Sequence, residues 1–80
     1  MEEIFDWKTA RDNMFKLRLK ANLNQTELGE QLGVSAAVIC SYENGRVIPK
    51  ISFMEKFCYF FGVGIDDLYK KDMIKEIMNL

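Results

Sequence analysis

Histidine is absent from this 80-residue chain, and cysteine occurs only twice. The missing imidazole excludes histidine general-base catalysis, histidine-containing triads and Cys₂His₂ zinc sites. Two thiols, Cys40 and Cys58, are too few for a four-thiolate metal site or a disulfide framework, which indicates a reducing compartment. Because a phosphate-cradling glycine loop and a nucleophile–base pair are also missing, we expect no metal, no cofactor and no enzymatic activity.

An excess of charge of one sign is missing as well. Eleven basic and twelve acidic residues leave a net charge of −1, which rules out a polybasic arm and makes no case for nucleic acid by composition alone. No apolar run approaches the ~18–20 residues that span a bilayer, and the acidic start lacks the basic lead of a signal peptide. We therefore expect one cytoplasmic domain over residues 1–80, with no membrane contact.

The apolar pattern that is present is helical throughout, and no stretch alternates as a half-buried strand does. This pattern predicts an all-α fold. The first helix is expected from about Asp6 to Ala21, with Asn22 just beyond its end. Its buried stripe is expected to comprise residues spaced by three or four positions, namely Trp7, Ala10, Met14, Leu17 and Ala21.

Two short helices are expected next. Asn24 and Glu27 have the spacing of a capping box, and Gly33 is suited to the left-handed residue that ends a helix. The following helix is expected to begin after an N-cap at Ser35 and to stop at Asn44-Gly45.

Two further helices and a tail complete the expected order. Ser52–Glu55 has the spacing of a second capping box, for a helix that ends at Gly62. A short fifth helix is expected near Ile65, and the apolar residues of segment 70–80 continue at helical spacing.

The two short helices are joined by only three residues, 33–35, which forces a large crossing angle between them. Gly29 lies where the helices must approach closely. A glycine inside a helix costs roughly 1 kcal/mol relative to alanine, so we expect a packing reason for it. The apolar residues expected to clamp the pair are Leu28, Leu32, Val34, Ile39 and Tyr42.

Several short motifs resemble a known family. They are Leu17-Arg18, Asn24-Gln25-Thr26-Glu27-Leu28, Leu32-Gly33-Val34-Ser35, Ile39-Cys40-Ser41-Tyr42-Glu43-Asn44-Gly45-Arg46, Pro49 and Gly62-Val63-Gly64-Ile65-Asp66-Asp67-Leu68. Each alone is weak, but together they are similar to the Cro/C1-type helix-turn-helix family of phage and bacterial regulators, also called the Xre family. The resemblance covers about Met14 to Tyr69. It implies a compact five-helix, lambda-repressor-like domain, with its core over 9–69, its helix-turn-helix over 25–44 and a C-terminal helix over 70–80.

The resemblance also implies roles for particular residues. The helix Ala36–Glu43 would enter the major groove of double-stranded DNA. Gln25 would contact a phosphate and brace that helix, and Asn44 would meet the backbone on the other side. Arg18 and Glu43 would form a partly buried ion pair, with two separately solvated charges as the alternative. The residues implied to face the bases are Ser35, Ala36, Ala37, Cys40 and Ser41.

Elementary chemistry adds to this interpretation. The N-termini of both short helices suit phosphate, and Arg46, Lys50 and Lys16 would add Coulombic attraction. The stretch from Ser35 to Ser41 holds no arginine, glutamine or asparagine. We therefore expect specificity to depend on contacts with thymine methyl groups, on water bridges and on DNA shape.

A small reading helix covers few base pairs, so such domains usually bind as twofold dimers. The expected homodimer contact is the set Met73, Ile74, Ile77 and Met78, with packing of the tail on its own domain as the alternative. Phe5 and Trp7 form another candidate interface, for which core packing is the favoured interpretation. No small-molecule ligand is expected.

The sequence thus predicts a sequence-specific DNA-binding regulator, most simply a dimeric repressor. The alternative is a protein-interaction module or antitoxin with the same fold, which the near-neutral charge and the apolar reading helix would suit. For Cys40, the favoured interpretation is a small residue that happens to be cysteine, with a redox-sensing thiol as the alternative. Cys58 is expected in the core.

Overall fold

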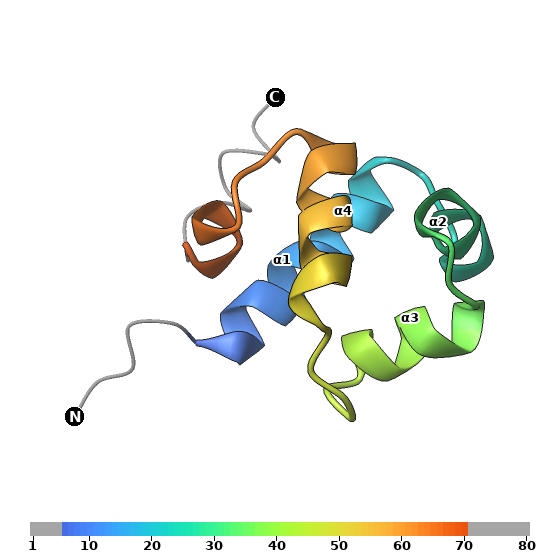
Figure 1. The fold of residues 1–80 in the computed structure, drawn as a ribbon, viewed down its shortest axis with the longest axis horizontal. Helices are drawn as coiled ribbons and strands as arrows, with labels where there is room; N and C mark the ends of the chain where they lie inside the picture. The colour runs from blue at the N-terminus through green and yellow to red at the C-terminus, as the bar shows by residue number, and fades with distance from the viewer. Residues whose placement is uncertain (1–5, 71–80) are drawn as a thin grey trace.

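The computed structural model describes residues 6–70. Within this range the chain forms four α-helices and one short 3₁₀-helix, without a strand (Figure 1). Their bounds are α1 Trp7–Lys20, α2 Gln25–Leu32, α3 Ala36–Glu43, α4 Ile51–Phe61 and the 3₁₀-helix η1 Asp66–Tyr69. The all-α prediction is confirmed, and the expected fifth helix is this single 3₁₀ turn. Lys70 follows it in an extended conformation, and residues 71–80 of the expected C-terminal helix lie outside the described range.

Local capping chemistry explains where the first two helices begin and end. The Asp6 carboxylate accepts a hydrogen bond from the Lys8 amide at 3.0 Å and so starts α1. Asn22 adopts a left-handed conformation (φ 59°) just beyond α1, as predicted. The capping box of α2 is complete, with Asn24 Oδ1 to the Glu27 amide at 2.7 Å and Glu27 Oε1 to the Asn24 amide at 2.9 Å.

The remaining helix limits follow the prediction with one exception. Ser35 caps α3 by accepting from the Val38 amide, and Gly62 ends α4 in the left-handed region. The expected capping box at Ser52 is wrong: the Lys50 carbonyl accepts the first intrahelical bond, from the Met54 amide at 3.1 Å. Helix α4 therefore begins at Ile51 after an N-cap at Lys50 that makes no side-chain cap. Ser52 is already inside the first turn, where its hydroxyl cannot serve as the N-cap.

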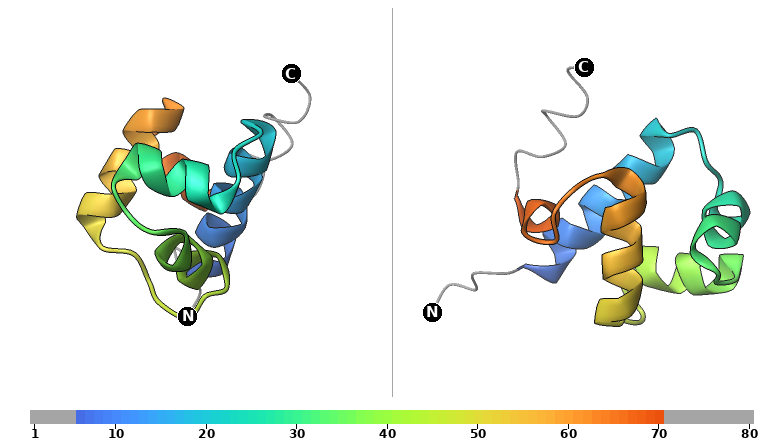
Figure 2. Two further views of the ribbon diagram at one scale, coloured as in Figure 1. Left: turned by 90° about the vertical axis from the view of Figure 1, so that its right-hand side faces the viewer. Right: turned by 45° about the horizontal axis from the view of Figure 1, so that its top comes forward.

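The core forms where α1, α2, α3 and α4 meet. The views in Figure 2 show α3 and the start of α4 at one end of the molecule. The buried apolar side chains are Ala10, Met14, Leu17, Leu28, Leu32, Ile39, Phe53, Met54, Phe57, Cys58 and Leu68. Phe53 contacts Tyr42 edge-on, with ring centroids 4.7 Å apart, and Phe57 packs on Phe61 at 4.6 Å.

The expected stripe of α1 is correct at its centre and wrong at its C-terminal end. Trp7 is only half-buried, packed against the core. Ala21 is exposed because it is the C-cap, where the chain turns away towards α2. The polar residues Asn13 and Arg18 are buried on this helix instead.

Asn13 ties η1 to α1. Its Nδ2 donates to the Leu68 carbonyl and, at 3.0 Å, to the Lys70 carbonyl. Leu68 itself is fully buried. A buried amide that satisfies two carbonyl groups holds this turn where the chain leaves its last described helix.

Cys58 is a core residue, as predicted. Burial raises the pKa of its thiol, and the negative charges of Asp67 and Asp66 raise it further. A buried, protonated thiol is chemically inert. Cys40, by contrast, is half-buried on α3. None of the described helices is both long and apolar enough to cross a bilayer.

Gly29 has the packing reason that the sequence predicted. A Cβ atom built at this position would overlap the Val34 carbonyl oxygen and lie 3.3 Å from the Ser35 carbonyl carbon. The Val34 amide in turn donates to the Gly29 carbonyl at 2.9 Å. The absence of a side chain therefore lets the turn fold back onto α2 and sets the direction of α3.

We predict that Gly29→Ala destabilises the domain by about 1–3 kcal/mol, because the added methyl must displace backbone. This is opposite in sign to the usual gain from replacing glycine by alanine inside a helix. Urea unfolding followed by circular dichroism measures the difference. Glu30→Ala, at the next and exposed position of α2, is the matched control and should leave stability nearly unchanged. A Gly29→Ala variant as stable as the parent would contradict the assigned role.

Candidate nucleic-acid interface

Helices α2 and α3 form a helix-turn-helix at one edge of the domain. Figure 1 shows α3 along this edge, with α2 across its beginning and the loop to α4 continuing from its end. Ile39 is the only residue of α3 that is fully buried, with 2% of its surface exposed. Ile39 therefore fixes the inner face of α3, with Tyr42 packed beside it against the core, and the outer face remains accessible.

The residues predicted to face the bases lie together on this outer face. Ser35 and Ala37 are exposed, and Ala36, Cys40 and Ser41 are half-buried. Two of their polar groups are already engaged. The Ser41 hydroxyl donates to the Ala37 carbonyl at 3.0 Å, and Cys40 Sγ accepts from Asn44 Nδ2 at 3.2 Å.

One carboxylate connects three helices behind this surface. Glu43 of α3 accepts two hydrogen bonds from the Arg18 guanidinium of α1, at 2.7 and 3.0 Å. It accepts a third from Gln25 Nε2 at the start of α2, at 3.0 Å. Arg18 also donates to the Leu23 carbonyl at 2.8 Å. The two charged side chains are only 8% and 10% exposed, so the structure contains the ion pair implied by the resemblance, in bidentate form.

Gln25 thus stands at the first turn of α2 with one amide proton bound to Glu43. This contact is the brace between α2 and α3 that the resemblance implied. Its remaining amide groups lie where the N-terminal dipole of α2 favours an anion.

Positive charge follows α3 in the chain. Arg46 and Lys50 are exposed in the loop between α3 and α4. Between Gln31 and Met54 the only acidic residue is Glu43, whose charge Arg18 balances. Lys16 is exposed on α1, outside the α2–α3 pair. The loop that follows α3 therefore carries two exposed positive charges, although the charges of the whole chain nearly cancel.

Arg11 is a further cation near this edge that the sequence did not suggest. A Cβ built at Gly45 would overlap its guanidinium, so the side chain lies against the end of α3. Nothing in the local sequence connects Arg11 with Gly45, since they are brought together only by packing of α1 on α3.

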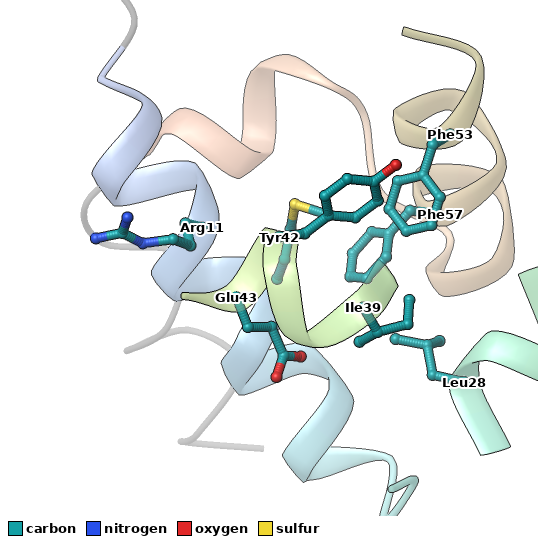
Figure 3. A pocket seen from close by; sticks show the side chains of 8 residues that line it. Arg11, Leu28, Ile39, Tyr42, Glu43, Phe53 and Phe57 are labelled. Carbon is teal, nitrogen blue, oxygen red and sulfur yellow. The ribbon is translucent and has the colours of Figure 1, made fainter. Parts of the chain in front are cut away.

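A small cavity lies beneath α3, lined by side chains from all four α-helices (Figure 3). Its lining residues are Arg11, Met14, Leu28, Ile39, Tyr42, Glu43, Phe53 and Phe57. Its volume of about 10 Å³ holds no more than one water molecule. The cavity is thus a packing defect of the core rather than a ligand site.

The residues predicted for a dimer contact are outside the described structure. Met73, Ile74, Ile77 and Met78 all lie beyond Lys70, and Phe5 precedes Asp6. Trp7 is described, and it packs partly against the core.

Comparison with known proteins agrees with this geometry. The helix-turn-helix family model matches residues 14–68. The chain therefore belongs to the Cro/C1-type helix-turn-helix family, a class of DNA-binding transcription regulators. No solved structure matches it significantly.

The similar curated proteins carry regulator names. The chain is 38% identical over 52 residues to the cryptic phage CTXphi transcriptional repressor RstR of Vibrio cholerae, covering 65% of this chain and 47% of that protein. It is 40% identical over 48 residues to an uncharacterised HTH-type transcriptional regulator of Methanocaldococcus jannaschii, covering 60% and 73%. It is 37% identical over 57 residues to the HTH-type transcriptional activator BcrR of Enterococcus faecalis, covering 71% and 28%. The match thus spans about half of the repressor and less than a third of the activator.

We predict that Glu43→Ala destabilises the domain by about 3–5 kcal/mol, because it leaves the buried Arg18 charge without its partner. Arg18→Met combined with Glu43→Leu should recover most of this loss, since no unpaired charge remains. Chemical unfolding of the variants measures both effects. Lys70→Ala is the control for an exposed ion pair, the Lys70–Asp67 contact, and should cost far less. Equal losses for the buried and the exposed pair would contradict this account.

Proposed function

We propose that this domain is a sequence-specific DNA-binding transcriptional regulator that inserts α3 into the major groove. The observation that carries the proposal is the accessible outer face of α3, held outward by the Gly29 contact and by the Glu43 network. The major groove of DNA is wide enough to admit an α-helix. A helix that is anchored on one side and accessible on the other can therefore enter it.

Phosphate contacts would set its orientation. We assign them to Gln25 at the N-terminus of α2, to Asn44, Arg46 and Lys50 at the far end of α3, and to Lys16 of α1. Gln25 reaches Glu43, the last residue of α3, and Asn44, Arg46 and Lys50 follow that residue in the chain. We propose that Gln25 contacts the DNA backbone on one side of the groove and Asn44 with its neighbours on the other. Such contacts contribute affinity without sequence information.

Base contacts would come from Ser35, Ala36, Ala37, Cys40 and Ser41. The hydroxyl proton of Ser41 is engaged by the Ala37 carbonyl. Towards a base, Ser41 would therefore accept a hydrogen bond, from the amino group of cytosine or adenine. The alanines would contribute apolar contacts only.

We further propose that the protein binds as a homodimer on two half-sites about one helical turn apart. Met73, Ile74, Ile77 and Met78 are the proposed contact. Repression is the simplest outcome, because a dimer bound at a promoter excludes polymerase. The proposed role is binding rather than catalysis, and the proposed location is the cytoplasm, where a DNA target would be reached.

A second candidate role is a protein-interaction module, as in an antitoxin. It is supported by Tyr59, which is 91% exposed on α4, and by its neighbour Phe60 at 41%. These rings lie near the C-terminal end of α4, whereas α3 adjoins the N-terminal end (Figure 1). A partner bound there would leave α3 accessible, so the two roles are compatible.

The main proposal is tested by selection from a random duplex library, followed by mobility-shift titration at several salt concentrations. We expect an enriched twofold-symmetric site bound by two chains. The logarithm of its binding constant should fall with the logarithm of salt concentration, by about 0.9 for each phosphate contacted. Binding no tighter than to random duplex, even at low salt, would refute sequence-specific recognition.

We predict that Gln25→Ala and Ser41→Ala impair binding differently. The first should weaken binding to all duplexes alike, because it removes a phosphate contact and the brace on Glu43. The second should change preference at one or two base pairs, by about 1–3 kcal/mol each. Titration of both variants against a panel of single-base-pair substitutions separates the effects. Identical profiles for the two variants would disprove this division of roles.

A further inference from the structure

We propose that Val47 determines specificity by completing a shallow groove that receives the C5-methyl group of a pyrimidine in the major groove. The groove is lined by Ala37, Val38, Ser41, Tyr42 and Val47. This inference rests on the proposed function and adds to it a residue from outside the helix-turn-helix.

The groove is built from two segments of the chain. Ala37 and Ser41 lie four residues apart on one side of α3, and Val38 and Tyr42 lie four apart beside them. The fifth lining residue, Val47, comes from the loop that follows α3. Two of the five lining residues, Ala37 and Ser41, belong to the outer face of α3 assigned to the bases, so the groove is continuous with that surface.

The chemistry of the groove selects a methyl group. Three of its five lining side chains are aliphatic, and the Ser41 hydroxyl proton is bound to the Ala37 carbonyl. The Tyr42 ring is held edge-on against Phe53. Among the groups that base pairs present in the major groove, the C5-methyl of thymine is the apolar one, and 5-methylcytosine presents the same group.

A methyl group bound in the groove would bury part of the exposed Val47 side chain. Val47 is 51% exposed in the isolated domain, and a methyl group placed against it would remove apolar surface of both partners from water. Its neighbour Ile48 is even more exposed, at 66%, but does not line the groove. Val47 and Ile48 are therefore both apolar and exposed, but only Val47 lines the groove.

The test uses the full chain and the duplex obtained by selection, in which each thymine is replaced in turn by deoxyuridine. At one thymine per half-site we expect affinity to fall about fourfold, the effect of one buried methyl group. Val47→Ala should bind the thymine and deoxyuridine duplexes equally at that position. Ile48→Ala, the matched control, should retain the parent's discrimination.

A second arm identifies the source of the methyl group. At the same position, cytosine and 5-methylcytosine are compared in otherwise identical duplexes. A preference for 5-methylcytosine that Val47→Ala abolishes would show that the groove reads the methyl on either base. No preference, with thymine still favoured over deoxyuridine, would assign the groove to thymine alone.

Three results would overturn the inference. One is a selected duplex that tolerates deoxyuridine everywhere. Another is a Val47→Ala variant that weakens binding equally with and without the methyl group. The last is a Val47→Ala variant that shifts the monomer–dimer equilibrium in sedimentation without altering discrimination, which would assign Val47 to contact with a second copy. Failure to enrich any duplex would instead overturn the proposed function itself, so the two failures are distinguishable.

Discussion

The Glu43 carboxylate is the point on which the arrangement of the helices depends. It accepts hydrogen bonds from α1 through Arg18 and from α2 through Gln25 while belonging to α3. Two short helices of eight residues each are marginal on their own, so their orientation must come from tertiary contacts. A nearly buried carboxylate that accepts three hydrogen bonds supplies direction as well as attraction, because hydrogen bonds weaken steeply when the helices that carry their donors move.

The proposed function depends on the face of α3 that the Glu43 network leaves accessible. With Ile39 buried, Tyr42 packed on Phe53 and Glu43 fully hydrogen-bonded, the outer face of α3 is available as a surface, and that surface has few hydrogen-bond donors. Under the proposed function, such a surface would read DNA through shape and apolar contact, with phosphate contacts beside it supplying affinity. The local positive charge of Arg46 and Lys50 is consistent with this, although the charges of the chain as a whole nearly cancel.

The sequence predicted features that depend on neighbours in the chain and missed those that depend on distant contacts. The capping box at Asn24 and the left-handed residues Asn22, Gly33 and Gly62 are local, so their chemistry is visible in the sequence. The prediction of a capping box at Ser52 was wrong because the spacing of a capping box does not by itself fix where a helix begins. The first turn of α4 instead closes on the Lys50 carbonyl. The burial and role of Asn13 could not be predicted from its neighbours in the chain, because its hydrogen-bond partners are 55 and 57 residues away.

The amino-acid sequence by itself determined the helical class, the limits of most helices, and the close approach at Gly29, because propensity, capping and steric size act over a few residues. Only the tertiary structure decided which side of α3 stays open, where Arg11 lies, and that Val47 lines one groove with Ala37 and Ser41. Those relations arise when separate segments bury their apolar faces against a common core. Burial is non-directional, so a pattern of apolar residues specifies that a face is buried but not which distant residue it meets.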